Sequence, residues 1–373
     1  MKILLLGDAS NYHSTLATGL ARAGHDVTVA SAGSGWMNTA RDIDISRRPG
    51  RLGGALLWLK LNTVLSGKLK GYDVVQLYNP VFVHQRPQRV RTLFDRLRRD
   101  NGSVFLSHLS TDSPYVDMCF AKDNPLRYSE FMASGVPTPY TISHQQIVAE
   151  WMSGPLHDLC SYIYEHIDGA VSALYEYHLA CLRALPQEKV AYGGIPIDMS
   201  RIAYSGIPSD GKLRIMVACH KGREAEKGVD RMLPVVSRLA LEYPDRLELD
   251  LVQNVPIEEF RKRLDATHIV VDQLYSYTPA TTALMAMAGG KIVVSGAEKE
   301  YYDFIGEKAL HPIINADPDD PDALYDTLRA LLFDRERVRC LSEEGRAFVS
   351  RHNDADTVAR RFIDFWTKTM NIE

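Results

Sequence analysis

Short apolar runs alternate with segments of helical composition along the whole chain, and this order restricts it to folds built on parallel sheets. In the first half we predict strands at 2–7, 26–31, 73–78, 103–108, 169–174 and 189–193, with helices between them. In the second half, strands near residues 213, 247, 268, 291 and 311 alternate with helices again. Parallel strands are joined by right-handed crossovers, so each half predicts its own α/β unit.

A polar stretch with turn chemistry, SGIPSDGK (205–212), separates the two patterns. With 373 residues the chain is long enough for two domains, each with its own core. We therefore predict a Rossmann-like N-terminal domain over 1–204 and a second Rossmann-like domain over 205–356. Ligands of open α/β sheets lie beyond the carboxyl ends of the strands, so polar residues that follow strands are the first functional candidates.

One such candidate follows the strand HIVVDQL (268–274), where the loop YSYT leads into a helix. Thr278 fits an N-cap, and Pro279 fits the first helical position. The next three amides would then lack partners within the helix, and such an end attracts phosphate. They belong to Ala280, Thr281 and Thr282. Any strand, loop and helix unit needs a cap, so a purely structural role stays open.

A second candidate is the basic turn after the strand LRIMVAC (213–219), which contains Lys221, Arg223 and Lys227. Phosphates are held by fixed cations as well as by helix ends, and an arginine can engage two oxygens at once. The turn and the loop therefore predict two halves of a diphosphate site. The alternative is that the turn is only a solvated charge cluster.

These segments resemble the retaining GT-B glycosyltransferases of the "glycosyl transferases group 1" family. In that family a strand is followed by Arg, then by Lys-Gly and a helix, and a later helix reads L-E-A-M-A-x-G. The corresponding segments of this chain read EKGVDRM and LMAMAGG. GGIPIDMSRI (193–202) is similar to the family's linker, and FLSHLSTDSP (105–114) to its histidine segment. The resemblance spans the chain. It implies a GT-B fold, with two Rossmann-like domains facing across a central cleft and a last helix, 357–373, packed on the N-terminal domain.

By this resemblance Arg223, Lys227 and Gly228 hold the diphosphate of a nucleotide-sugar donor. The loop that would hold sugar and phosphate comprises Tyr275, Tyr277, Thr278, Pro279, Ala280, Thr281 and Thr282. The chain departs from the family where two glutamates stand eight residues apart, because Tyr277 and Met285 occupy these places. Neither side chain accepts hydrogen bonds as a carboxylate does, so Glu298 and Glu300 are candidates to take over this role.

The N-terminal half supplies candidates for acceptor binding and catalysis. Its first turn has no G-x-G-x-x-G and no acidic residue ends the second strand, which argues against NAD. In the GT-B interpretation four polar residues face the acceptor: Asn11, His13, Asn79 and Asp112. The alternative for the first turn is that Ser10 and Asn11 cap a helix while His13 is merely exposed.

His108 is the predicted catalytic residue. It ends the strand SVFLSHL, where we expect it to hydrogen-bond the donor sugar or to orient a hydroxyl. A structural histidine bonded to a neighbouring carbonyl is the alternative. In retaining members the leaving phosphate is thought to help deprotonate the acceptor, so no protein base is required.

Basic residues gather in one part of the N-terminal half, although the net charge is −4. From 47 to 72 there is no acidic residue, and the apolar run LLWLKL lies among the cations. We predict docking of 47–99 on an anionic membrane surface, which would suit a lipid-linked acceptor. Nucleic acid is not an expected partner, because no groove-reading motif accompanies the arginines. The alternative is a pair of crossover helices with solvated outer faces.

The segment 111–151 has no regular βα pattern and is rich in Pro, Tyr and Phe. Long irregular segments in compact domains are often functional, so we expect part of the acceptor site here, with a folded insertion that only packs as the alternative.

The five cysteines are odd in number and widely spaced, which indicates reduced thiols in the cytoplasm. MKILLLGD is a strand rather than a charged leader, and there is no apolar run of about 18 residues. We expect a cytoplasmic protein with a peripheral position on the inner membrane face. No cluster has metal-ligand spacing, and no cofactor is expected besides the nucleotide-diphosphate sugar substrate.

The function predicted from these features is a metal-independent, retaining transfer of a hexose-like sugar to a glycan or lipid-linked acceptor in polysaccharide biosynthesis. A catalytically silent homologue that binds nucleotide or a partner is the second hypothesis, and a sugar-nucleotide epimerase the third. The sequence leaves the base, the sugar, the acceptor and the oligomeric state open.

Overall fold

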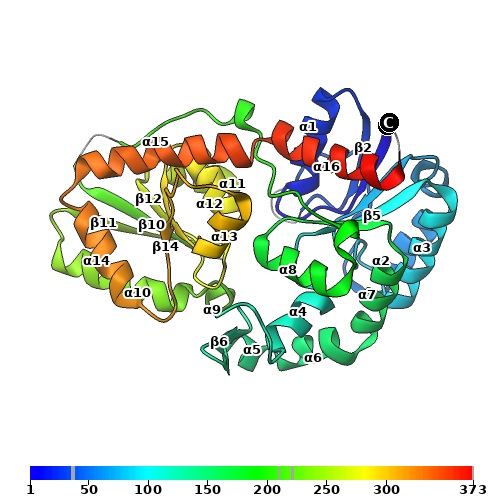
Figure 1. Ribbon diagram of the computed structural model, residues 1–373, viewed down its shortest axis with the longest axis horizontal. Coiled ribbons are helices and arrows are strands. Elements are labelled where there is room, and N and C mark those ends of the chain that lie inside the picture. Colours follow the sequence, from blue (N-terminus) through cyan, green and yellow to red (C-terminus); the bar gives the residue numbers. More distant parts are fainter. Residues whose placement is uncertain (35–37, 209–210, 220–221, 372–373) are drawn as a thin grey trace. The chain divides into compact units, whose positions relative to one another are not determined.

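The computed structural model describes residues 1–34, 38–208, 211–219 and 222–371. The chain divides into two compact units, both visible in Figure 1. Unit 1 comprises Met1–Met118, Gln146–Asp198 and Ala355–Glu373, and unit 2 comprises Cys119–Gln145 and Met199–Asp354.

Unit 1 is built on a seven-stranded sheet with the order β3-β2-β1-β4-β5-β8-β9, and all neighbouring strands are parallel. The strands are β1 (Lys2–Leu6), β2 (Asp26–Ser31), β3 (Ile43–Asp44), β4 (Val74–Leu77), β5 (Ser103–His108), β8 (Gly169–Ser172) and β9 (Val190–Tyr192). Six of them lie within two residues of their predicted positions. The short edge strand β3 was not predicted, because two residues carry no periodicity.

The helices of this part of the chain are α1 (Tyr12–Arg22), α2 (Gly50–Asn62), α3 (Pro87–Asp100), α4 (Ser113–Phe120), α6 (Gln145–Ser153), α7 (Pro155–His166), α8 (Tyr175–Ala184) and α16 (Ala355–Met370), with 3-10 turns at Ser66–Leu69 and Gln187–Lys189. Successive strand residues point to opposite faces of the sheet. Leu4 and Leu6 therefore share one core cluster with apolar residues of α2, α3 and α7. On the opposite face Phe105 packs against Phe365 and Trp366 of α16.

The last helix, α16, lies beside α1 although the two are far apart in sequence; they are red and blue in Figure 1. Their approach requires a glycine, since a Cβ on Gly19 would lie 2.3 Å from the carbonyl oxygen of Ala355. Arg22 of α1 pairs with Asp356 of α16 at 2.6 Å. Trp366 donates its indole N–H to the buried Gln76 at 2.9 Å. The end of the chain thus completes one face of unit 1.

Unit 2 contains a five-stranded parallel sheet with the order β11-β10-β12-β13-β14. Its strands are β10 (Leu213–Cys219), β11 (Leu247–Gln253), β12 (Ile269–Val271), β13 (Ile292–Ser295) and β14 (Ile314–Asn315). Its helices are α9 (Glu224–Lys227), α10 (Val229–Glu242), α11 (Ile257–Ala266), α12 (Thr281–Ala288), α13 (Lys299–Ile305), α14 (Pro321–Leu331) and α15 (Arg335–His352), after a 3-10 turn at Met199–Arg201. The described residues include no helix that is both long enough and apolar enough to cross a membrane.

The segment Cys119–Gln145 clusters with unit 2, whereas the predicted N-terminal domain ran without interruption from 1 to 204. It holds the antiparallel hairpin of β6 (Met132–Ala133) and β7 (Val136–Pro137), followed by α5 (Pro139–Ser143). The ring of Phe131 packs against Phe120 and Tyr140 within the segment. The segment is therefore a folded insertion with its own aromatic packing.

Candidate functional site

The sheet of unit 2 changes its direction of growth between β10 and β12. The chain passes from β10 to β11 on one side and from β12 to β13 on the other. At such a switch point the loops after two adjacent strands diverge and leave room for a ligand. The two predicted halves of the diphosphate site follow these two strands, so the strand order brings them to the same edge of the sheet.

The two halves are in direct contact. Leu274, in the loop after β12, donates its backbone N–H to the carbonyl of Lys227 at 2.8 Å. A Cβ on Gly228 would lie only 2.5 Å from the Cβ of Leu274, and the φ of Gly228 is +69°. Close approach and a left-handed backbone both require glycine here. Gly228 therefore joins the basic turn to the loop.

The ammonium of Lys227 binds a buried carboxylate that the sequence did not single out. Lys227 Nζ lies 2.7 Å from Oδ1 of Asp272, whose side chain is 0% exposed while that of Lys227 is 19% exposed. The other oxygen of Asp272, Oδ2, is buried without a hydrogen-bond partner among the described residues. A buried carboxylate needs a cation to compensate its charge. Lys227 supplies that cation at the rim of the predicted site.

Arg223 is more loosely held. It precedes α9 and pairs with Glu226, with Nε and Oε2 2.7 Å apart and the arginine side chain 50% exposed. Exposed pairs of this kind contribute only about 0–1 kcal/mol, so a phosphate can replace Glu226 at little cost. Lys221, the third predicted cation, lies outside the described residues.

The predicted start of the helix after the loop is wrong by two residues. Helix α12 begins at Thr281, with Ala280 as the N-cap residue and no side-chain cap. Thr278 lies before the helix, where the hydroxyl of Ser276 accepts its amide at 3.2 Å and donates to its carbonyl at 2.5 Å. Because Thr278 is held in this turn, it does not act as the N-cap residue of the helix. The first-turn amides are accordingly those of Thr281, Thr282 and Ala283 rather than Ala280, Thr281 and Thr282, and Pro279 belongs to the loop.

Tyr277 and Met285 stand where the resembled family has its two glutamates, and the structure shows a role for Tyr277. Tyr277 is buried, and its hydroxyl accepts the backbone N–H of Arg127 at 2.7 Å. Its ring also packs against Tyr128, with the centroids 5.0 Å apart. Tyr277 thus fastens the insertion 119–145 to the loop. Met285 is half-buried in α12 and has no polar side-chain atom to replace a carboxylate.

Glu298 is occupied by protein partners. One oxygen accepts Tyr128 Oη and, at 2.7 Å, Asn315 Nδ2; the other accepts Arg127 at 2.9 Å. A buried carboxylate with three donors is satisfied, so Glu298 does not replace the missing glutamate in this structure. Glu300, in the first turn of α13, is exposed.

Several residues of this site were not predicted from sequence. Besides Asp272, the insertion contributes Arg127 and Tyr128, and Arg231 approaches the hydroxyl of the buried Tyr275 at 3.4 Å. The acid that directly follows the aliphatic run IVV (269–271) was an available signal for Asp272. Arg127 and Tyr128 carried none, since their partner is 170 or more positions away in sequence.

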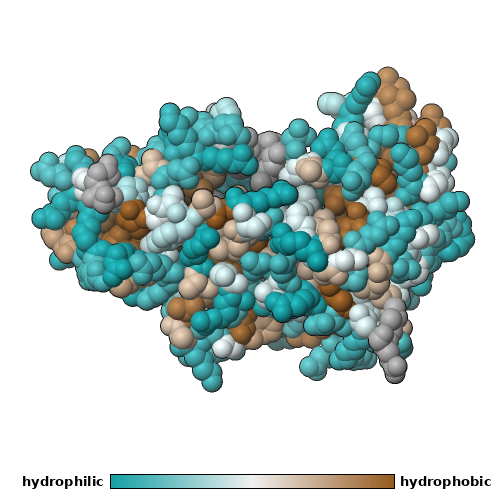
Figure 2. Space-filling view, turned by 90° about the horizontal axis from the view of Figure 1, so that it is seen from above, coloured by the Kyte–Doolittle hydropathy of each residue, from teal (hydrophilic) through white to brown (hydrophobic). Residues whose placement is uncertain are grey.

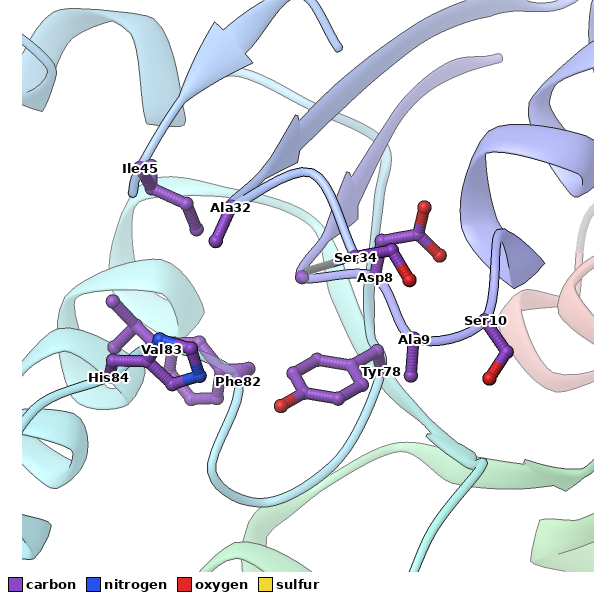
Figure 3. Close-up of a pocket in the computed structure, with 11 residues that line it drawn as sticks. Asp8, Ala9, Ser10, Ala32, Ser34, Ile45, Tyr78, Phe82, Val83 and His84 are labelled. Carbon is purple, nitrogen blue, oxygen red and sulfur yellow. The ribbon is translucent and has the colours of Figure 1, made fainter. Parts of the chain in front are cut away.

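A pocket of 280 Å³ opens at the corresponding switch point of unit 1, between β1 and β4. Figure 3 shows the rings of Tyr78, Phe82 and His84 on one side and Ala32 and Ile45 on another. The polar lining comes mainly from Asp8, Ser10 and Ser34. Gly7 at its base admits Tyr78, because a Cβ there would lie 2.0 Å from the tyrosine ring.

Of the four predicted acceptor residues, none lines this pocket. Asn11 lies next to it, half-buried, with its amide donated to Thr15 at 3.0 Å. Asn79 is buried and joins neighbouring loops through Ser110 at 3.0 Å. His13 and Asp112 are wholly buried. Buried as they are, Asn79, His13 and Asp112 do not present free side chains to a ligand.

No protein-family model matches the sequence, and no curated protein is similar to it. Solved structures are similar in fold at low identity. The chain superposes on the sucrose-phosphate synthase of Thermosynechococcus elongatus with a TM-score of 0.61 and 13% identity, covering 100% of both chains. For HepE of Anabaena in complex with UDP and glucose the TM-score is 0.55 and the identity 13%, covering 98% of both. For a glycosyltransferase of Rickettsia africae they are 0.56 and 10%, covering 100% of this chain and 99% of the other.

The chain has the GT-B fold. Its two α/β units correspond to the two Rossmann-like domains that the resemblance implied. Within this GT-B chain, the described residues contain no group of three or more His, Cys, Asp or Glu side chains that could hold a metal ion.

His108 does not have the position predicted for it in a GT-B enzyme. Its side chain is 0% exposed and stacks on Tyr177, with ring centroids 4.5 Å apart. Nε2 lies 3.1 Å from Asp112 Oδ1, and Nδ1 lies 3.3 Å from the sulfur of Cys181. Burial alone would lower the pKa of His108, but the carboxylate of Asp112 raises it to about 10. The pair is an interior ion pair, and the catalytic role predicted for His108 is corrected to a structural one.

His13 belongs to a buried hydrogen-bond chain of the same GT-B unit. Trp366 donates to Gln76, Gln76 donates to Ser107 at 2.9 Å, and Ser107 Oγ lies 3.1 Å from His13 Nε2. His13 Nδ1 lies 2.8 Å from the carbonyl oxygen of Gly7 and donates to it, which leaves Nε2 as the acceptor for Ser107. The neutral imidazole is therefore required. Burial lowers the pKa of His13 to about 4.

This burial predicts a loss of stability in mild acid. Below the ordinary histidine pKa of about 6.5, His13 is protonated in the unfolded chain but stays neutral in the folded protein. Folding therefore becomes less favourable as the pH falls from 6.5 toward 4. The expected contribution is roughly 3 kcal/mol across that range. His13→Gln should flatten the dependence of the unfolding midpoint on pH between 6.5 and 4.5, while His84→Gln, at an exposed position, should leave it unchanged. Equal slopes for all three proteins would contradict the assignment.

Proposed function

We propose that this GT-B chain is a glycosyltransferase that moves a sugar from a nucleoside-diphosphate donor to a glycan or lipid-linked acceptor, with retention of configuration. One observation carries the proposal: Arg223, the Lys227–Asp272 pair and the uncapped start of α12 follow adjacent strands at the switch point of unit 2. HepE, which shares the fold, has been solved with UDP bound, and this supports the proposal that a diphosphate binds at this edge of the sheet.

In the proposed reaction these cations and amides act by electrostatic stabilisation of the leaving group. Negative charge develops on the diphosphate as the bond to the sugar breaks, and fixed cations and free amides stabilise it because they are already oriented. Arg223 would exchange Glu226 for phosphate oxygens, while Asp272 keeps Lys227 in place. In the proposed mechanism the leaving phosphate accepts the proton of the acceptor hydroxyl, so the protein mainly positions the reactants. No metal and no further cofactor are part of the proposal.

The sugar and the ribose need hydrogen-bond acceptors, and the usual two glutamates are replaced. Since Glu298 is satisfied by Arg127, Tyr128 and Asn315, we assign the available carboxylate role to Glu300, which is exposed at the start of α13. The acceptor would use the 280 Å³ pocket of unit 1, whose Asp8, Ser10 and Ser34 can bind hydroxyl groups. A cytoplasmic location fits the five free cysteines of the chain.

Removing the guanidinium of Arg223 should weaken donor binding without unfolding the protein. We expect Arg223→Gln to raise the dissociation constant for UDP about tenfold or more, since a charge-assisted contact to phosphate is worth roughly 1.5–3 kcal/mol. Titration calorimetry with UDP, GDP and dTDP measures this and identifies the base. Arg238→Gln is the matched control, because Arg238 forms a similar exposed pair with Glu242 in α10. Unchanged affinity in Arg223→Gln, or no heat with any nucleotide, would reject the donor site.

The missing glutamates also favour a second candidate, a silent homologue that binds nucleotide without transferring sugar. Hydrolysis or transfer of a nucleotide sugar that is lost in Arg223→Gln would exclude it. An epimerase would instead convert the nucleotide sugar with no acceptor present, so product analysis in the absence of acceptor separates the two enzymatic possibilities.

A further inference from the structure

Helix α2 of unit 1 presents an unpartnered row of leucines. Leu52, Leu56 and Leu59 are 80%, 54% and 59% exposed. Their spacing of four and three residues places them on one face of the helix. The opposite face, with Gly53, Gly54, Leu57 and Leu61, is buried against the core. Figure 2 shows brown, apolar atoms projecting at the upper right, from the part of the surface that unit 1 forms. Three exposed leucines in a row call for an apolar partner.

Beside the same helix lies a second pocket, of 150 Å³, lined by four arginines. Arg47 lies in the loop before α2, and Arg51 lies in the first turn of α2. Arg86 and Arg89 come from the start of α3. The remaining lining residues are Gly54, Ala55 and Gln85, so none of the lining residues is acidic. Four cations around one hollow repel each other unless an anion lies between them.

Hydrogen bonds to the backbone and between side chains hold some of the residues that line the pocket. Gln85 and Arg89 both donate to the carbonyl of Gly54, at 2.8 and 3.3 Å, and Arg89 also donates to Gln85 at 3.1 Å. These bonds tie the start of α3 to α2. The guanidinium of Arg47 lies 3.3 Å from where a Cβ on Gly54 would stand, so the glycine leaves space for it. The guanidinium groups can thus converge on one anionic group.

We propose that α2 docks unit 1 on an anionic lipid surface, with the leucine row in the acyl boundary and a lipid phosphate in the arginine pocket. The occupant must be apolar along the helix and anionic at its side, and a membrane of anionic phospholipid has both properties. A second copy of the chain fits less well, because pairing two α2 helices would bring two arginine sets together. The surface is separate from the donor site, so this inference does not depend on the proposed transfer reaction.

Sedimentation with vesicles tests the proposal on the full chain without any nucleotide. We expect binding to vesicles of phosphatidylcholine with 30% phosphatidylglycerol, weak binding to phosphatidylcholine alone, and a loss of binding in high salt. Leu52→Ser/Leu56→Ser and Arg47→Gln/Arg51→Gln should each weaken binding about tenfold or more. Leu241→Ser in α10, at an 82% exposed leucine, and Arg261→Gln in α11 are the matched controls and should bind as the natural chain does.

Four results would overturn the proposal. The first is equal binding to both kinds of vesicle, and the second is unchanged binding in the leucine variant. The third is a concentration-dependent dimer in analytical ultracentrifugation that the leucine variant abolishes, which would assign the surface to self-association. Soluble glycerol phosphate at millimolar concentration that protects the arginines from modification, together with no vesicle binding, would make the pocket a site for a free phosphate ester and likewise reject membrane docking.

Discussion

Lys227→Ala should lower the free energy of unfolding by about 3–5 kcal/mol and also abolish donor binding. The stability effect arises because Asp272 would remain buried as a carboxylate with no cation, its Oδ2 having no hydrogen-bond partner among the described residues even now. Such a loss is a large part of the about 5–15 kcal/mol by which a domain is usually stable. Urea denaturation measures the first effect, and calorimetry with UDP on the remaining folded protein measures the second.

The double variant Lys227→Ala/Asp272→Asn separates the two effects. Removing the carboxylate charge should restore most of the lost stability, whereas donor affinity should stay low because the cation is still absent. Lys212→Ala is the control, since Lys212 is exposed and contacts only a backbone carbonyl in the described structure. If the double variant binds UDP like the natural chain, Lys227 is structural and no phosphate ligand. If it remains as unstable as the single variant, the compensation argument fails.

His108→Gln should destabilise the protein by a similar amount, about 3 kcal/mol or more, and leave donor affinity unchanged. Its side chain neutralises Asp112, which also accepts Tyr164 at 2.7 Å and the amide of Tyr115 at 3.1 Å. Because the carboxylate raises the pKa of His108 to about 10, the stability that it contributes is complete below pH 6.5 and is lost as the pH rises from 6.5 through 10. Thermal unfolding of the natural chain should show this alkaline decline.

The same decline should disappear in His108→Gln and in Asp112→Asn, because either change removes the coupled titration. A catalytic histidine would behave differently: its loss would reduce turnover per folded molecule and leave the alkaline dependence of stability in place. That result would restore the role predicted from sequence and contradict the burial of His108 in the folded protein.

The strands were predictable because β-branched and aliphatic runs bounded by turn residues are a local signal, and those predicted in unit 1 lie within two residues of their expected places. The start of α12 was not. Thr278 and Pro279 fit a helix terminus, but they also fit the turn that Ser276 closes, and sequence chemistry permits both. The choice depends on packing around the loop: a Cβ on Gly296 would lie 1.6 Å from the carbonyl of Ser276.

The site was predictable to the extent that it depends on strand ends. The contact between the turn at Gly228 and the loop at Leu274 follows from the order of β10 and β12. The roles of His108, His13 and Glu298 did not follow, since a polar residue at a strand end, or in the loop or helix that follows the strand, can face either solvent or the interior. Neighbours distant in sequence decided this: Cys181 for His108, Ser107 for His13, and Arg127 for Glu298.

The sequence by itself determined the alternation of strands and helices, the two α/β units and the residue types available for a diphosphate site, because these depend on local periodicity and turn chemistry. Only the tertiary structure decided which charged groups are paired and which remain available. It paired Lys227 with Asp272 and Glu298 with Arg127, and it left the arginines beside α2 facing an open pocket. The physical reason is that the energy of a charge depends on its burial and on its nearest opposite charge, and chain folding alone sets both.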